Sequence, residues 1–163
     1  MPLEIERKFL VDGDAWRSGV RRRELYRQGY VAGSELCSVR VRAGGERAWL
    51  GLKGRVSGAT RLEYEYEIPL VEANEILERM CARGHIEKWR HWVPHEGHEW
   101  EVDEFLGENA GLVVAEIELD SEAERFERPA WLGSEVTEDS RYLNTSLARH
   151  PWRAWHATGS VAK

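Results

Sequence analysis

Glu4, Glu6 and Lys8 occupy alternate positions close to the start of the chain. On an extended strand, alternate side chains point to the same face, so these three groups would lie together. Magnesium prefers oxygen ligands and usually completes its shell with water and phosphate. A strand of this pattern could therefore hold a metal ion with its carboxylates and a phosphate with its lysine. A solvated strand face also collects Glu and Lys, so the pattern alone leaves both interpretations open.

Charged side chains recur at alternate positions along the later strand-like segments, and they are sorted by sign. Three segments carry bases only, namely Arg40 and Arg42, Lys53, and Lys88 with Arg90. Three others carry mostly or only acids. The first has Arg61 followed by Glu63, Glu65 and Glu67, the second has Glu101 and Asp103, and the third has Glu116, Glu118 and Asp120. Like charges directly opposite each other destabilise a sheet. The sorting indicates that a metal ion and an anionic ligand lie between the two groups.

The elements that carry these residues favour an antiparallel barrel or a strongly curved sheet of the α+β class. Strands are expected at residues 3–11, 25–32, 36–42, 47–53, 61–70, 85–93, 99–105 and 112–119, several of them joined as hairpins. Helices are expected at residues 15–20, 71–83, 121 to about 129, and 137 to about 147. The tail after His150 receives no assignment.

Closing such a sheet places one face of every strand inside, and eight strands leave room for a small ligand. Charged groups inside are costly unless they are paired or liganded. Acidic walls would bind a divalent metal ion, and Arg and Lys would bind phosphoryl oxygens. The arrangement suits phosphoryl transfer, and several linked phosphates match the number of bases better than one phosphate does.

Composition limits the other possibilities. A chain of 163 residues with 42% hydrophobic and 32% charged residues predicts one globular domain over residues 1–163. The net charge of −6 gives no bulk attraction to nucleic acid or to an anionic membrane, so neither partner is expected. No apolar run reaches the length of a membrane span and no signal peptide is evident, which favours the cytoplasm.

Several other residues are expected to have structural roles. Cys37 and Cys81 are expected to be reduced core residues, and the stripe of Ile76, Leu77, Met80 and Cys81 to pack in the core. His91, His95 and His98 are expected to be exposed in a turn. The sequence contains neither a P-loop nor a dinucleotide-binding glycine motif.

The chain resembles the CYTH, or triphosphate tunnel metalloenzyme, family through about residue 149. The family signature Glu-x-Glu-x-Lys is matched by Glu4, Glu6 and Lys8. Further family-like motifs follow in order at residues 27–30, 39–42, 52–53, 61–65, 87–90, 116–118 and 136–139. The resemblance implies a closed antiparallel eight-stranded barrel with a few flanking helices. Such a barrel forms a tunnel that binds triphosphate together with Mg²⁺ or Mn²⁺.

The resemblance also implies roles for residues. The metal ligands would be Glu4, Glu6, Glu116 and Glu118, with Glu63, Glu65 and Asp103 as further acidic positions that ligate the metal or orient water. The triphosphate would be held by Lys8, Arg40, Arg42, Lys53, Arg61, Lys88 and Arg90. Lys88 would also position the attacking water or accept its proton. Tyr30 would lie near the tunnel as a further catalytic residue.

The short form of the chain is most similar to bacterial inorganic triphosphatases, which split tripolyphosphate into pyrophosphate and phosphate. A small-molecule triphosphate is the expected partner, and a homodimer stays open. One alternative keeps the fold but changes the substrate, giving a nucleoside or thiamine triphosphatase or an adenylate cyclase. Another is a module that binds polyphosphate or nucleotide without turnover. A scaffold with a charged surface is the third, and the sorting of charges by sign argues against it.

Overall fold

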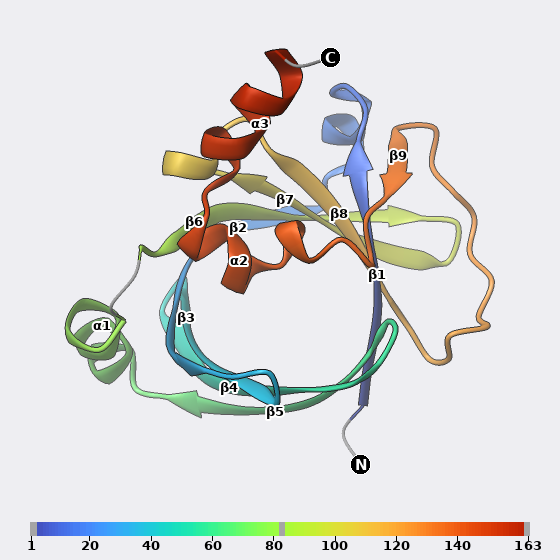
Figure 1. Cartoon of the computed structure of the whole chain (residues 1–163). Coiled ribbons are helices and arrows are strands. Elements are labelled where there is room, and N and C mark those ends of the chain that lie inside the picture. Colours follow the sequence, from blue (N-terminus) through green and yellow to red (C-terminus); the bar gives the residue numbers. More distant parts are fainter. Residues whose placement is uncertain (1–2, 82–83, 162–163) are drawn as a thin grey trace.

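The structure, a computed structural model, describes residues 3–81 and 84–161, with the backbone alone at residues 56–57 and 157–161. The strands in this part are β1 (Leu3–Val11), β2 (Arg22–Gly33), β3 (Cys37–Gly44), β4 (Arg47–Ser57), β5 (Thr60–Ile68), β6 (Ile86–His95), β7 (His98–Phe105), β8 (Val113–Leu119) and β9 (Leu132–Glu135). The helices are α1 (Leu70–Arg79), α2 (Asn144–Arg149) and α3 (Trp152–Val161), with the 3-10 turns η1 (Ala15–Gly19), η2 (Gly107–Asn109) and η3 (Ser140–Tyr142). Figure 1 shows the strands curving around a central space, with the C-terminal helices on one side.

Strands β1 to β8 form a closed antiparallel barrel. Their order is β5-β4-β3-β2-β6-β7-β8-β1, and β1 closes the ring by pairing again with β5. Three residue pairs make this closure, from Leu3 with Leu62 to Ile5 with Thr60. The expected eight-stranded barrel is confirmed, and β9 is an additional strand that pairs with the far end of β1.

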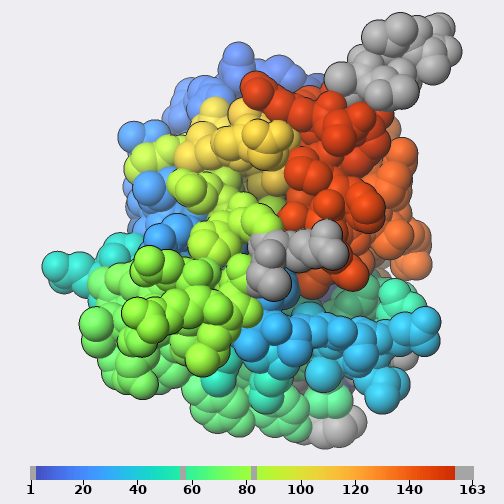
Figure 2. Space-filling view, turned by 60° about the vertical axis from the view of Figure 1, so that its left-hand side comes forward, coloured from blue at the N-terminus to red at the C-terminus, as the bar shows by residue number. Residues whose placement is uncertain are grey.

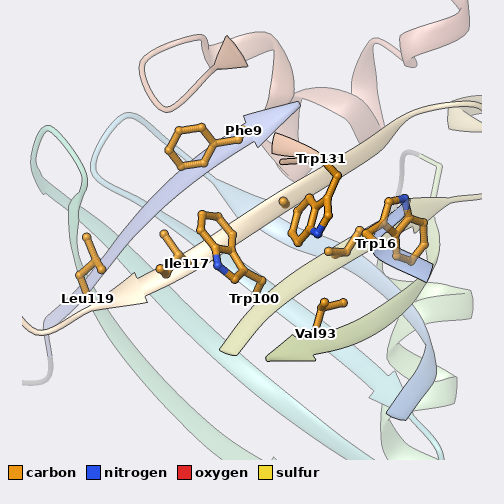
Figure 3. Close-up of a cluster of buried hydrophobic side chains, with 9 residues drawn as sticks. Phe9, Trp16, Val93, Trp100, Ile117, Leu119 and Trp131 are labelled. Atoms are coloured by element: carbon orange, nitrogen blue, oxygen red, sulfur yellow. The ribbon is translucent and has the colours of Figure 1, made fainter. Parts of the chain in front are cut away.

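The main hydrophobic core lies on the outer face of the barrel wall, as Figure 3 shows. Phe9 of β1, Trp100 of β7 and Ile117 of β8 are almost fully buried there, and Trp131 covers them from the segment before β9. Trp100 and Trp131 pack edge to face with ring centroids 5.8 Å apart. Because side chains alternate along a strand, the charged neighbours of these residues point into the barrel.

Helix α1 covers a second part of the wall but is shorter than residues 71–83. Leu77 is fully buried, whereas Met80 ends the helix and is 60% exposed, so its expected place in the core is wrong. Met80 closes the last turn with a backbone hydrogen bond to Ile76, after which the chain leaves the helical path. Residues 82–83 of the expected helix lie outside the described residues.

The segment after β8 also differs from expectation, because residues 121–129 form bends and irregular chain instead of a helix. The carboxylate of Glu124 accepts hydrogen bonds from the Asp120 backbone N–H at 2.6 Å and lies 2.6 Å from His98 Nε2. Phe126 packs edge to face on Phe9 and Trp100. These tertiary contacts outweigh the local helix signal.

The helix expected at residues 137–147 is divided in two. The 3-10 turn η3 comes first, Leu143 is extended with φ −65° and ψ 139°, and α2 then begins at Asn144. The backbone oxygen of Tyr142 accepts a hydrogen bond from Lys8 Nζ at 3.2 Å. A side chain of β1 therefore binds a backbone carbonyl beside the point where the helix is interrupted.

The tail after His150 forms α3, which the sequence left unassigned. The backbone N–H of Trp152 donates to Asn109 Oδ1 at 2.8 Å, and Trp155 packs edge to face on Tyr142 at 5.4 Å. Figure 2 shows this segment, in red, lying against the yellow segment that contains η2. The two tryptophans thus extend a buried cluster on the outside of the barrel.

Two smaller expectations are also wrong. Both cysteines are free as expected, but Cys37 is exposed at the start of β3 instead of buried, whereas Cys81 is half-buried against the core cluster of Leu77. His91 was expected to be exposed but is buried against Trp16, with ring centroids 4.8 Å apart. It follows Arg90, which points into the barrel, so the side chain of His91 lies on the outer face of β6. Among the helices of the described chain, none is long and apolar enough to span a membrane.

Candidate active site

The barrel encloses a cavity of about 1070 Å³. Its wall includes fourteen of the residues predicted for the site: Glu4, Glu6, Lys8, Tyr30, Arg40, Arg42, Lys53, Arg61, Glu63, Glu65, Lys88, Arg90, Glu116 and Glu118. All of them except Tyr30 carry a charge, and they come from seven of the eight strands of the ring, with Tyr30 on β2. The alternation along each strand brings them to the same interior.

Asp103 lies behind this wall and holds two of the bases. Its Oδ1 accepts from Arg90 Nε at 2.8 Å, and its Oδ2 accepts from Arg90 Nη2 at 2.8 Å and lies 2.8 Å from Lys88 Nζ. Burial would raise the pKa of Asp103, but Arg90 and Lys88 hold that pKa well below its usual range. Asp103 is therefore an ionised anchor with both oxygens engaged by cations.

Arg42 lies close to two other arginines that line the cavity. Burial lowers the pKa of Arg42 to about 10, and the nearby cations Arg40 and Arg90 act in the same direction. The Tyr26 ring lies under both Arg42 and Arg90, with guanidinium carbons 4.8 and 5.4 Å from its centroid. Cations that repel each other in a buried space would be stabilised by a multiply charged anion between them.

Three carboxylates of the cavity, in contrast, have raised pKa values. Burial raises the pKa of Glu4, and Glu63 raises it further, although the ammonium of Lys53 opposes both effects. Burial also raises the pKa of Glu118, with contributions from the carboxylates of Glu4, Glu101 and Glu63. Burial and the neighbouring carboxylate of Glu6 likewise raise the pKa of Glu116. Carboxylates that disfavour each other's charge are suited to a divalent cation.

Lys53 stands between the acids. Its Nζ lies 2.9 Å from Glu4 Oε1 and 3.5 Å from Glu63 Oε2. In residues 3–81 and 84–161, no three acidic, His or Cys side chains form a ready-made metal cluster. The oxygen-only donor set and the mutual repulsion of the carboxylates nevertheless fit a divalent metal ion that takes oxygen ligands.

Two predicted residues have further contacts. The hydroxyl of Tyr30 accepts a hydrogen bond from Gln28 Nε2 at 3.2 Å. Arg61 Nη1 donates to the backbone oxygens of Gly58 at 2.8 Å and Thr60 at 3.1 Å, so this end of its guanidinium is tied to its own turn.

Three functional candidates escaped the sequence assignment. Glu101 lines the cavity and pairs with Arg90 Nη1 at 3.3 Å; its place beside Asp103 on the acidic face of β7 was a usable signal. Gln28 is fully buried and alternates with Tyr30 on β2, which also was readable. Asn144 lines the cavity from α2, and no strand periodicity could have revealed it.

Comparison with known proteins agrees with this geometry. Residues 2–150 match the family described as the CYTH domain. The chain is 54% identical over 153 residues to an inorganic triphosphatase of Acetivibrio thermocellus, covering 94% of this chain and 97% of the relative. It is 37% identical over 150 residues to an inorganic triphosphatase of Nitrosomonas europaea, covering 89% and 96%.

Solved structures give the same result. The crystal structure described as the inorganic triphosphatase NE1496 superposes with a TM-score of 0.65 at 34% identity, covering 89% of this chain and 93% of that one. The PH1012 protein of Pyrococcus horikoshii gives a TM-score of 0.58 at 19% identity, covering 73% and 79%. The second likeness concerns the fold alone.

Proposed function

The chain belongs to the CYTH domain family, and from that membership we propose that it hydrolyses inorganic triphosphate to pyrophosphate and phosphate inside its barrel. The observation that carries the proposal is the cavity inside the barrel, which Arg42, Arg90 and Lys88 line together with the carboxylates of Glu4 and Glu116. Two relatives, at 54% and 37% identity, are inorganic triphosphatases, which supports the same substrate.

The bases of the cavity would bind the phosphate oxygens. Arg40 and Arg42 carry planar guanidinium groups that can bind two oxygens at once, whereas lysines act as point charges. The full set comprises Lys8, Arg40, Arg42, Lys53, Arg61, Lys88 and Arg90. Burial, and then repulsion from Arg40 and Arg90, lowers the pKa of Arg42, and the negative charge of three linked phosphates would offset both effects.

Glu4, Glu6, Glu116 and Glu118 would hold Mg²⁺ or Mn²⁺, with Glu63 and Glu65 close by. When bound, the ion would neutralise phosphate oxygens and favour charge development on the departing pyrophosphate. We assign Asp103 to a different task, since its two oxygens already engage Lys88 and Arg90.

Lys88 is the group we assign to the attacking water. Burial lowers the pKa of its amine to about 7, and Arg90 and Arg42 act in the same direction against the attraction of Asp103. With a pKa close to 7, part of Lys88 is the neutral amine at neutral pH, and this form can accept a proton during the reaction. The water oxygen bonds to the terminal phosphorus, the bridging P–O bond breaks, and the water proton passes to Lys88 Nζ. Tyr30, which also lines the cavity, would orient this water.

The test measures phosphate release from the purified chain with tripolyphosphate, ATP and thiamine triphosphate side by side. Each substrate is assayed with Mg²⁺, with Mn²⁺ and with a chelator. Metal-dependent release from tripolyphosphate far above the other two is the expected result. Faster phosphate release from ATP or thiamine triphosphate would show that this compound, and not tripolyphosphate, is the substrate. Tight binding without release of phosphate would show that the chain is a binding module and not an enzyme.

Lys88→Met and Arg47→Ala complete the experiment. Lys88→Met should lose turnover, since the replacement has no amine. Arg47 pairs with Glu67 outside the cavity lining, so Arg47→Ala controls for the loss of a barrel cation as such.

A further inference from the structure

Asn144 reaches into the barrel interior from outside the ring of strands. It is the first residue of α2, and it lines the cavity that the strands enclose. Its side-chain oxygen Oδ1 accepts a hydrogen bond from Lys88 Nζ at 3.0 Å. The same oxygen accepts a second hydrogen bond from Gln28 Nε2 at 3.2 Å. One amide therefore contacts two strands, β6 and β2.

The first of these contacts fixes Lys88. Lys88 Nζ lies 2.8 Å from Asp103 Oδ2 of β7, and it donates a hydrogen bond to Asn144 of α2. The side chain of Lys88 is 1% exposed, so its position depends on these protein contacts. A long lysine side chain with a single anchor could pivot about it, whereas two anchors on different elements fix the nitrogen in space.

The second contact extends to the substrate-binding arginine. Gln28 is fully buried, and its Oε1 accepts from Arg42 Nε at 3.0 Å. Its Nε2 donates both to Asn144 and to the Tyr30 hydroxyl. The amides of Gln28 and Asn144 thus join Arg42, Tyr30 and Lys88, which come from three different strands, into one hydrogen-bonded network.

The side chain of Asn144 is neutral, which suits its place beside a bound anion. An acceptor is needed beside Lys88, but a second carboxylate there would add negative charge next to a bound anion. Asp103 already supplies the counter-charge from behind the wall. An amide oxygen orients Lys88 Nζ without repelling phosphate.

We propose that Asn144 is a positioning residue that fixes Lys88 directly and Arg42 and Tyr30 through Gln28. Its catalytic consequence rests on the proposed function. Displacing a reacting group by about 1 Å can cost about 100-fold in rate, so Asn144→Ala should lower kcat about 10- to 100-fold. The rise in KM should be smaller than the loss in kcat, because Arg40, Arg90 and Lys8 still bind the phosphates.

The kinetic test compares Asn144→Ala with Asn74→Ala. Asn74 accepts a hydrogen bond from Arg27 on the outer side of the barrel. Asn74→Ala therefore removes the same kind of side chain and one hydrogen bond to an arginine, but outside the cavity. Asn74→Ala should retain the kcat of the unmodified chain. A kcat for Asn144→Ala within about twofold of the unmodified chain would overturn the proposal, since misplacement of Lys88 must slow the reaction.

A second measurement does not depend on turnover. NMR spectra of chain labelled with ¹³C at the lysine ε carbon are recorded in chelator, and the Lys88 signal is assigned with Lys88→Met. Asn144→Ala should shift or broaden the Lys88 signal, and Asn74→Ala should not. An unchanged Lys88 signal in Asn144→Ala would refute the positioning role. If the unmodified chain releases no phosphate from tripolyphosphate, the proposed function fails, while this spectrum still decides whether Asn144 fixes Lys88.

Discussion

Lys88 Nζ lies 2.8 Å from Asp103 Oδ2, and the two side chains are only 1% and 0% exposed. Arg90 shares the same carboxylate through two hydrogen bonds of 2.8 Å. One buried anion therefore holds two buried cations in the wall of the cavity. Removing one member of a buried ion pair is costly because the remaining charge stays buried without its partner.

Replacing this anion should destabilise the fold. Asp103→Asn keeps the shape of the side chain but leaves Lys88 and Arg90 without their counter-charge. We expect the free energy of unfolding to fall by about 3–5 kcal/mol, measured by urea denaturation. Asp139→Asn is the matched control, because Asp139 pairs with Arg141 at the surface, where such pairs contribute about 0–1 kcal/mol. Equal losses in the two variants would show that Asp103 carries no special weight.

Acids and bases of the cavity should affect different kinetic constants. Glu4→Gln or Glu6→Gln removes a carboxylate that we assign to the metal, so metal-dependent turnover should fall roughly 100-fold or more. Added chelator should reduce the unmodified chain to a similar rate. Titration of Mn²⁺ against initial rate is the measurement, and a rate near that of the unmodified chain in either variant would contradict the assignment.

Arg40→Ala should mainly weaken substrate binding. A hydrogen bond between charged groups contributes about 1.5–3 kcal/mol, so the Kd for tripolyphosphate in chelator should rise about 10- to 100-fold. Calorimetry measures this directly. Arg47→Ala, which removes an exposed partner of Glu67, should bind as the unmodified chain does. A fall in kcat with unchanged affinity would assign Arg40 to the reaction instead of to binding.

Gly44 should not tolerate a side chain. A Cβ there would overlap the ring of Tyr26, the ring that lies beneath Arg42 and Arg90. Gly44→Ala should therefore displace Tyr26 and cost about 1–3 kcal/mol, as overpacking of a filled core does. At Gly84 a Cβ would meet only ordinary contacts, so Gly84→Ala is the control. Thermal unfolding of both variants decides, and equal midpoints would show that the Tyr26 ring can move freely.

Stability should depend on pH through His91. Burial lowers the pKa of His91, although Glu104, 3.3 Å from its ring nitrogen, acts in the opposite direction. The unfolded chain then binds more protons than the folded chain as pH falls below the ordinary value of about 6.5. The contribution of neutral His91 is complete above that value and is lost as pH decreases toward the lowered pKa.

His91→Gln should remove this part of the pH dependence. The free energy of unfolding of the unmodified chain should fall more steeply between about pH 7.5 and about pH 5.5 than that of the variant. Urea denaturation at several pH values measures both slopes. Parallel slopes would show that His91 titrates alike in the folded and unfolded chain.

Alternation made the barrel and its lining predictable. Along β3 and β6 the charges and apolar residues follow a period of two, and only one face of a strand can point inward. The thirteen charged lining residues were therefore identifiable as one group from the alternation, whereas Tyr30 followed only from the family resemblance. The paired carboxylates of Glu4 and Glu6 and the bases Arg40 and Arg42 follow from this pattern directly.

The features that the sequence did not predict depend on contacts between segments far apart in the chain. A helix over residues 137–147 satisfies local propensity, but Lys8 from β1 bonds the oxygen of Tyr142 beside the break. The sorting of charges placed Asp103 among the acids, yet only the register of β6 against β7 places it opposite Arg90. Asn144 could not be found at all, because its role comes from where α2 lies and not from any repeat.

The pairing of β1 with β8 has a consequence for synthesis. Glu6 and Lys8 stand opposite Glu118 and Glu116 of β8, so the first strand made must wait for the last strand of the ring. Pairings so far apart in sequence are slow to form, and a chain emerging from the ribosome exposes β1 without its partner. A nascent chain that ends before Val113 therefore contains most of the bases but cannot yet assemble the cavity.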